Sequence, residues 1–274
     1  MMVIRHICST LILAGASLAL ATPVSAETSV ADRTFTHTLD NGMKIIVRED
    51  HRAPVMVSQV WYRVGSSYEH AGVTGVSHVL EHLMFKGTDK VPSGEFSKLI
   101  ARYGGSENAF TSYDYTGYYQ VMSATNLPLS IELEADRMQN AIMPDEEFAK
   151  EIEVVKEERR LRTDDKPNSV AYERFMAAAY LSSGYHNPVI GWMHDLDNMT
   201  GQDARNWYRQ WYVPNNAILV VVGDVNAKEV FGLASRYFGP IPAGDLPKRP
   251  LNKEVAGKGE RRIEVAIPAK IPTL

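Results

Sequence analysis

Cysteine is nearly absent from this 274-residue chain, which contains only Cys8. A single thiol can form neither an internal disulfide nor a zinc cage built from cysteines. Basic residues are not in excess, because 29 Lys and Arg stand against 33 Asp and Glu, for a formal net charge of −4. This weak acidity argues against nucleic-acid binding as the main function. The remaining composition, with 45% hydrophobic and 23% charged residues, is typical of a globular protein with one large or two small domains.

Long hydrophobic runs are scarce, and the one that stands out lies near the N-terminus. Residues 1–26 combine a positive start at Arg5, an apolar run from about residue 11 to residue 21, and the small-residue end Val24-Ser25-Ala26, which is the pattern of a secretory signal peptide. The alternative, a transmembrane anchor, is disfavoured because the run is shorter than the ~20 residues that span a bilayer. We therefore expect cleavage after Ala26 and secretion across the inner membrane into the periplasm. The mature chain then has no cysteine nucleophile and no membrane span.

Hydrophobic periodicity predicts a mixture of strands and helices. Two apolar, β-branched runs flank Asn41-Gly42, which is a strong hairpin signal. Because strands and helices are mixed without strict alternation, the pattern favours an α+β fold. The predicted strands cover residues 33–40, 43–47, 55–64, 113–123 and 217–222, and a further strand is expected to start at 265–267. The predicted helices cover 72–85, 95–103, 126–141, 145–162, 167–181, 203–212 and 227–238.

The most informative motif is His78-Val-Leu-Glu81-His82, which fits the reversed zincin pattern H-x-x-E-H. On a helix, the two histidines share one face and can bind one metal ion, while Glu81 can accept a proton from a metal-bound water without being a ligand. The alternative is a polar helix face with two solvated histidines. The strongly apolar opposite face argues against it, as do Gly72 and Gly75, which let the backbone approach a neighbouring segment. The other histidines of the mature chain lack metal spacing, and we expect them to be surface or packing groups: His37, His51, His70, His186 and His194.

A catalytic zinc site usually has three protein ligands, so a third is needed. The helix predicted over 145–162 holds candidate acids, of which Glu151 and Glu158 are seven residues apart and share one face within ~20°. The alternative is that these acids pair with neighbouring bases on a solvated surface, and spacing alone leaves the choice open. The candidate acids are Glu146, Glu147, Glu151, Glu153, Glu157 and Glu158, and the candidate bases are Lys156, Arg159 and Arg162.

Several short motifs accompany H-x-x-E-H in a fixed order. They are GVSHVLEHLMFKGT at 75–88, NAFT at 108–111, DYT at 114–116, EIEVVKEE at 151–158, YVPNN at 212–216 and GDV at 223–225. With these motifs the chain resembles the pitrilysin/insulinase (inverzincin) family of zinc peptidases, in the style of bacterial members related to the mitochondrial processing peptidase. The resemblance covers about residues 34–274 and only the N-terminal half of such a protein. It implies a mixed, largely antiparallel sheet packed with several helices.

The resemblance also implies roles for particular residues. One Zn²⁺ per chain is held by His78, His82 and a glutamate 76 residues after the second histidine, which is Glu158. Glu81 is then the general base, and Glu151 supports the site by bonding a ligand histidine. An edge strand pairs with an extended peptide substrate through main-chain hydrogen bonds. That strand comprises Asn108, Ala109, Phe110 and Thr111.

The function implied is a zinc-dependent endopeptidase, or the zinc-bearing half of one, that hydrolyses extended peptides or small unfolded proteins. The expected organisation is a signal peptide at 1–26, a metallopeptidase N-terminal-type domain at 27–240, and a linker with the interrupted start of a second domain at 241–274. Three explanations for the missing second half stay open: a partner chain supplies it, two like chains dimerise, or the sequence is a fragment. The alternatives are a non-catalytic peptide-binding partner subunit and an inactive truncated remnant.

Overall fold

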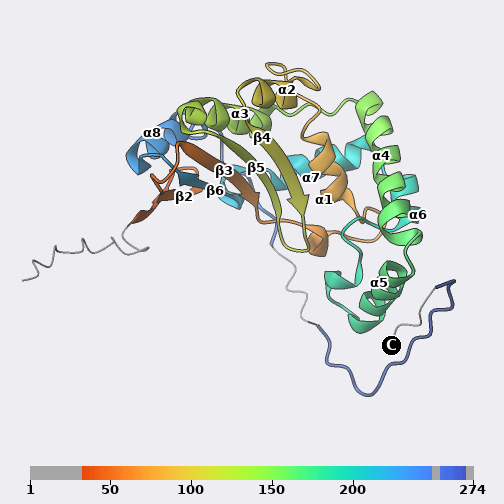
Figure 1. The fold of residues 1–274 in the computed structure, drawn as a ribbon. Helices are drawn as coiled ribbons and strands as arrows, with labels where there is room; N and C mark the ends of the chain where they lie inside the picture. Colours follow the sequence, from red (N-terminus) through yellow and green to blue (C-terminus); the bar gives the residue numbers. More distant parts are fainter. Residues whose placement is uncertain (1–32, 249–253, 270–274) are drawn as a thin grey trace, which may run out of the picture.

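A computed structural model describes residues 33–248 and 254–269, and the expected signal peptide at 1–26 lies outside them. Within these residues, six strands form one sheet in the order β1-β2-β6-β3-β5-β4 (Figure 1). Only the β2–β6 pair is parallel, and the other four pairs are antiparallel. The α+β class and the largely antiparallel sheet are therefore confirmed. The strands are β1 (Thr34–Thr38), β2 (Lys44–Glu49), β3 (Val55–Tyr62), β4 (Ser106–Thr111), β5 (Thr116–Ser123) and β6 (Ala217–Gly223).

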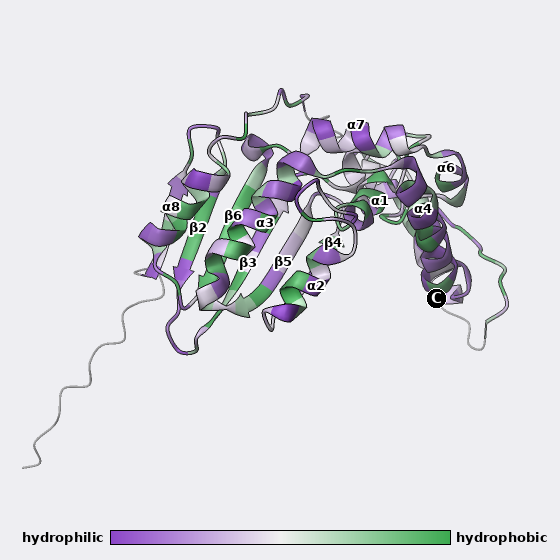
Figure 2. Ribbon diagram, turned by 90° about the horizontal axis from the view of Figure 1, so that it is seen from above, coloured by the Kyte–Doolittle hydropathy of each residue, from purple (hydrophilic) through white to green (hydrophobic). Residues whose placement is uncertain are grey.

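Helices α3 and α8 lie over the sheet, while α4, α5 and α6 form a separate group beside it (Figures 1 and 2). Helix α1 lies between the two groups and contacts α7, α4 and β4. No helix of the described residues is both long and apolar enough to cross a membrane. The helices are α1 (Val76–Leu83), α2 (Glu95–Arg102), α3 (Leu127–Asn140), α4 (Asp145–Arg159), α5 (Pro167–Ala179), α6 (Met193–Asn198), α7 (Gly201–Trp211) and α8 (Ala227–Tyr237).

Alternation along the strands decides which face of the sheet forms the core. On β3, Met56, Ser58, Val60 and Tyr62 are buried, while the residues between them are only half-buried. The same alternation runs along β5 and β6. Because successive side chains of a strand point to opposite faces, one face collects the large apolar groups and packs under the helices.

The predicted hairpin at Asn41-Gly42 joins β1 to β2. Gly42 has a φ of +86°, in the left-handed region that glycine adopts without strain. The side-chain amide of Asn41 donates to the backbone oxygens of Phe238 and Ile241, at 2.8 and 2.9 Å. The turn is therefore also tied to the segment that follows α8.

Several element boundaries differ from the sequence-based prediction, as where the helix predicted over 72–85 begins only at Val76. The strand predicted to begin at residue 113 begins at Thr116, because residues 112–115 form the turn between β4 and β5. The helix predicted over 145–162 ends as an α-helix at Arg159 and continues as a π-helical turn, Arg160–Asp164.

Two further segments were wrongly predicted. Helix α6 was missed because six residues are too few to display a helical period. The strand expected at 265–267 does not form within the described residues 254–269, where the segment has no paired neighbouring strand. Instead, the stretch 254–269 contacts the end of α5. Arg261, for example, donates a hydrogen bond to the backbone oxygen of Ala178 at 2.6 Å.

Candidate metal centre and active site

The start of α1 and the segment before it are held by two carboxylates from outside the helix, the buried Glu69 and the half-buried Asp195. Gly75, which precedes α1, has no capping side chain, and Glu69 takes that role. Its two oxygens accept hydrogen bonds from the backbone N–H groups of Gly75 and Ser77, at 2.6 and 2.8 Å. Burial raises the pKa of Glu69 to about 8, against the lowering effect of these N–H donors. Asp195 of α6 accepts three further hydrogen bonds from Gly72 and Thr74.

Gly75 also permits a close approach between two backbones. Its φ is +89°, and a Cβ at this position would lie 2.6 Å from the backbone oxygen of Ile190. The expected close approach is therefore confirmed at Gly75. The same expectation is wrong for Gly72, because a Cβ at that position would meet nothing within 4 Å. Gly72 has a φ of +96°.

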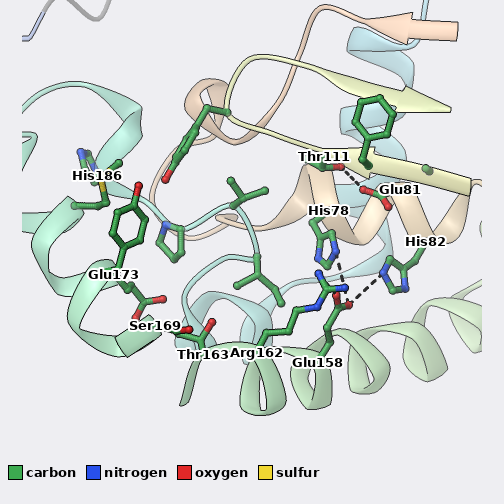
Figure 3. Close-up of a pocket in the computed structure, with 18 of the residues that line it drawn as sticks. His78, Glu81, His82, Thr111, Glu158, Arg162, Thr163, Ser169, Glu173 and His186 are labelled. Carbon is green, nitrogen blue, oxygen red and sulfur yellow. Dashed lines mark hydrogen bonds and ion pairs between the residues drawn. The ribbon is translucent and has the colours of Figure 1, made fainter. Parts of the chain in front are cut away.

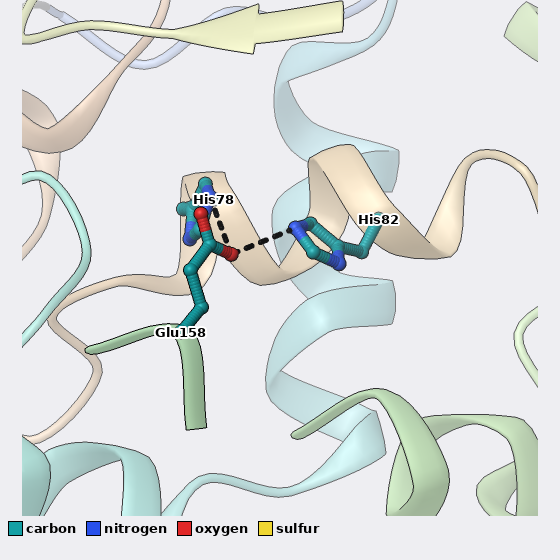
Figure 4. Close-up of side chains that lie close together, drawn as sticks. All are labelled: His78, His82 and Glu158. Carbon is teal, nitrogen blue, oxygen red and sulfur yellow. Dashed lines mark ion pairs between the residues drawn. The ribbon is translucent and has the colours of Figure 1, made fainter. Parts of the chain in front are cut away.

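Three ligand-type side chains meet between α1 and α4 (Figure 4). His78 and His82 lie one turn apart on α1, and Glu158 reaches them from the last turn of α4. Glu158 Oε2 lies 3.7 Å from His78 Nε2 and 3.5 Å from His82 Nε2. Both distances exceed the roughly 2.7–3.2 Å of an ordinary N–H···O bond. One potential ligand atom from each residue lies within 4.8 Å of the others, so the three surround a common point.

The remaining nitrogens of the two imidazoles have different surroundings. Nδ1 of His82 lies 3.2 Å from Glu151 Oε2, and Lys86 Nζ lies 2.6 Å from the other oxygen of Glu151. A proton on Nδ1 is therefore bonded to Glu151, which leaves Nε2 with a lone pair facing Glu158. Nδ1 of His78 is buried and has no hydrogen-bond partner among the described residues. Packing rather than a hydrogen bond therefore orients the ring of His78.

Burial and charge set the protonation of this cluster. Burial, together with neighbouring His82, lowers the pKa of His78 to about 4. Its ring is therefore neutral at neutral pH, as a metal ligand must be. For His82, burial acts in the lowering direction, but the carboxylates of Glu158 and Glu151 outweigh it and raise the pKa. Contact with His82 in turn lowers the pKa of Glu158.

Glu81 lies beside the three-residue cluster and contacts the edge strand instead. Thr111 Oγ1 on β4 donates a hydrogen bond to Glu81 Oε2 at 2.5 Å (Figure 3). Burial raises the pKa of Glu81, while the bond from Thr111 acts in the opposite direction. The carboxylate is thus fixed in orientation and more basic than an exposed glutamate, which suits it to proton transfer.

These groups open into a cavity of about 980 Å³ (Figure 3). One wall is β4, from which Asn108, Ala109, Phe110 and Thr111 all line the cavity. Among the described strands, β4 is one of the two edges of the sheet and pairs only with β5. An edge strand presents unpaired main-chain N–H and C=O groups, so β4 can accept an additional strand next to Glu81.

Other cavity residues were not predicted to belong to a site. Tyr113, Tyr172 and His186 also line the cavity, and no motif or spacing connects them. Arg162 also lines the cavity and forms an ion pair with Glu158 at 2.7 Å. Its spacing of four residues from Glu158 was the available signal, but the same spacing is typical of surface ion pairs.

Comparison with known protein families agrees with this arrangement. Residues 44–191 match the family described as insulinase, peptidase family M16, and residues 198–270 match the family described as peptidase M16 inactive domain. The chain is 43% identical over 202 residues to the zinc protease PqqE of Helicobacter pylori, covering 73% of this chain and 46% of that protein. It is 28% identical to an uncharacterized zinc protease, YmxG, of Bacillus subtilis, covering 76% of this chain and 50% of that protein.

Solved structures give the same result. A protease from Helicobacter pylori superimposes with a TM-score of 0.78 and 40% identity, over 81% of this chain and 54% of that one. The first half of the periplasmic protease PqqL from Escherichia coli superimposes with a TM-score of 0.75 and 27% identity, over 82% of this chain and 50% of that one. This chain spans about half the length of the curated relatives it matches. Sequence and fold together show that the chain belongs to the insulinase family of peptidases, peptidase family M16.

Proposed function

We propose that this chain is the zinc-bearing half of a metalloendopeptidase that hydrolyses extended peptides or small unfolded proteins. One observation supports this most strongly. The two imidazoles and the Glu158 carboxylate surround a common point, while Glu81 stands beside them and is hydrogen-bonded to the edge strand. A ligand set, a separate base and an open strand edge are the parts that peptide hydrolysis needs.

The donor set fits zinc. Two neutral imidazole nitrogens and one carboxylate oxygen form a three-ligand protein set of the kind found in catalytic zinc sites. In this proposal His78, His82 and Glu158 hold the ion, and Glu151 orients His82 through Nδ1. When bound, zinc supplies a Lewis acid that polarises a carbonyl and acidifies water.

Glu81 then carries out the proton transfers. Its Oε2 is held by Thr111, which leaves Oε1 to accept a proton from the attacking water. The same carboxyl returns that proton to the leaving amine. Because burial raises its pKa, the protonated form of Glu81 is less costly than it is for an exposed glutamate, as a shuttle requires.

Strand β4 is the proposed substrate platform. An extended peptide added to its open edge gains main-chain hydrogen bonds that do not depend on sequence. Since Thr111 lies at the end of β4 and also holds Glu81, a peptide paired with Asn108–Thr111 passes next to the base. This placement supports the proposed preference for extended rather than folded substrates.

A second half is the proposed partner. The chain covers about half of the relatives it matches, and residues 198–270 match the family described as peptidase M16 inactive domain. A separate chain or a second copy of this chain then closes the cavity. An unclosed half binds zinc and peptide but leaves the reacting carbonyl exposed to solvent.

The test is zinc-dependent cleavage of an unstructured peptide by the purified protein, with Glu81→Gln as the comparison. We expect Glu81→Gln to retain zinc and to lose at least about 100-fold in cleavage rate, the usual contribution of a general base. Equal cleavage by the two proteins would remove Glu81 from the mechanism. If the folded, zinc-loaded protein cleaves nothing, peptide hydrolysis requires the complex with a second half. The assay is then repeated in the presence of a partner chain.

We further propose that the chain is secreted across the inner membrane into the periplasm. The charge and apolar pattern of residues 1–26 supports this. The related PqqL of Escherichia coli is described as a periplasmic protease. N-terminal sequencing of protein from a periplasmic extract is expected to begin at Glu27. Full-length chain confined to the cytoplasmic fraction would contradict the proposal.

A further inference from the structure

Arg162 is the only arginine or lysine among the described residues that line the cavity. Its Nη1 lies 2.7 Å from Oε1 of Glu158. The other oxygen of the same carboxylate, Oε2, faces Nε2 of both His78 and His82 (Figure 3). The two oxygens of Glu158 therefore have different partners, the guanidinium on one side and the imidazoles on the other.

We propose that Arg162 is a positioning residue that makes Glu158 a one-oxygen ligand. By holding Oε1, the guanidinium leaves Oε2 as the oxygen offered to the metal and keeps the carboxylate from binding through both oxygens. This inference rests on the proposed function, because it takes Glu158 to be the third ligand. One coordination position of the metal therefore stays open, and a catalytic zinc needs such a position for its water or substrate.

The backbone after α4 carries Arg162 to this place. Glu158 lies in the last turn of α4, and the chain continues as the π-helical turn Arg160–Asp164 rather than as regular α-helix. Short π-helical turns occur frequently at functional sites. On the same turn, Arg160 pairs with Glu157, at 3.0 Å, and does not line the cavity. Two neighbouring arginines thus make similar ion pairs, one inside the site and one outside it.

The pair contributes to the site more than to the fold. The side chain of Arg162 is 69% exposed, whereas that of Glu158 is only 17% exposed. An ion pair with such an exposed partner adds little to folding stability. The effect on metal affinity is expected to be larger than the effect on stability, because mutating a residue that orients a metal ligand typically changes metal affinity by about 10- to 100-fold. Solvent around the guanidinium places Arg162 at the lower end of that range.

Arg162→Gln tests the proposal, and Arg160→Gln is its matched control. Both variants remove one positive charge and one ion pair from the same turn, but only Arg162 faces Glu158. Zinc affinity is measured on the purified protein by competition with a chromophoric chelator. We expect Arg162→Gln to bind zinc about five- to tenfold more weakly and Arg160→Gln to match the unchanged protein. Arg162→Lys recovers part of the affinity, because an ammonium supplies the charge without the planar fork.

The visible spectrum of the Co²⁺-substituted protein gives a second readout. Freed from Arg162, Glu158 is expected to bind through both oxygens, which raises the coordination number and weakens the absorption bands. A purely structural role would lower the melting temperature of the metal-free protein and leave the spectrum unchanged. Thermal melting of each metal-free variant is therefore recorded alongside, and we expect it to be unchanged.

Glu158→Gln separates failure of this inference from failure of the proposed function. Zinc loss in Glu158→Gln with full affinity and an unchanged Co²⁺ spectrum in Arg162→Gln would overturn the role of Arg162 alone. Retained zinc in Glu158→Gln would overturn the ligand assignment, and the role of Arg162 with it. Equal weakening in Arg162→Gln and Arg160→Gln would show that the effect does not depend on contact with Glu158, and would also overturn the inference.

Discussion

The carboxylate of Glu151 lies 3.2 Å from Nδ1 of His82, at the other ring nitrogen from the one that faces Glu158. Both glutamates come from α4, seven residues apart, and contact the same imidazole from its two ends. Lys86 binds the second oxygen of Glu151 at 2.6 Å and balances part of its charge. A hydrogen bond at Nδ1 fixes both the tautomer and the orientation of the ring.

Replacing Glu151 by Gln is expected to weaken zinc binding by about tenfold or more. The amide is less basic than the carboxylate and no longer pairs with Lys86, so the ring of His82 loses its orientation. Glu153→Gln is the control, because Glu153 lies on α4 and pairs with Lys156 at the exposed surface. Titration of both proteins with zinc tests this, and equal affinities would show that Glu151 has no part in orienting His82.

Glu158→Gln is expected to weaken zinc binding by at least about 100-fold, because it removes one of three protein ligands. Glu157→Gln, which changes the exposed partner of Arg160, is expected to leave zinc affinity unchanged. Equilibrium dialysis with metal analysis measures both. If the two variants bind zinc equally well, another acid is the third ligand.

Gly75→Ala is expected to destabilise the fold more than Gly72→Ala. Both positions have left-handed φ values, so each alanine costs about 1–2 kcal/mol in backbone strain. At Gly75 the added methyl group also meets the backbone oxygen of Ile190 at 2.6 Å, whereas at Gly72 it meets nothing within 4 Å. Urea denaturation of both variants measures the difference. Equal losses in the free energy of unfolding would mean that the backbone at Ile190 moves away from the added methyl group at little cost.

Glu69 is expected to make stability depend on pH. Its pKa is about 8 in the folded chain against 4.5 for an unperturbed glutamate. Between these values the folded state holds a proton that the unfolded state has lost, so the free energy of unfolding falls as pH rises from about 4.5 to about 8. The full fall is at most about 5 kcal/mol, from 1.36 kcal/mol for each pKa unit.

Glu69→Gln cannot ionise and is expected to lack this fall. The measurement is the free energy of unfolding of both proteins by urea denaturation at several values between pH 5 and pH 8. The difference between them is expected to shrink or reverse steadily as pH rises. Parallel curves would mean that Glu69 is already ionised in the folded chain, held by the N–H groups of Gly75 and Ser77.

Much of the fold follows from local pattern in the sequence. Strand alternation, the Asn41-Gly42 turn and most helix positions are predicted correctly, because each depends on residues close together in the chain. The misses have local causes too. Helix α6 is too short to show a period, and the turn at residues 112–115 carries aromatic residues that read as strand.

The sequence by itself determined that His78 and His82 lie on one helix face with Glu81 beside them, because the helical period fixes the relative directions of residues three and four apart. Spacing along the chain left six candidate acids open, and the family resemblance implied Glu158 and Glu151. The tertiary structure brings Glu158 to those two imidazoles and Glu151 to the other nitrogen of His82. It alone brings Thr111 to Glu81 and places Arg162 and His186 in the cavity. The physical reason is that these contacts join elements 30 to more than 70 residues apart, and such contacts are set by how helices pack against a sheet rather than by spacing along the chain.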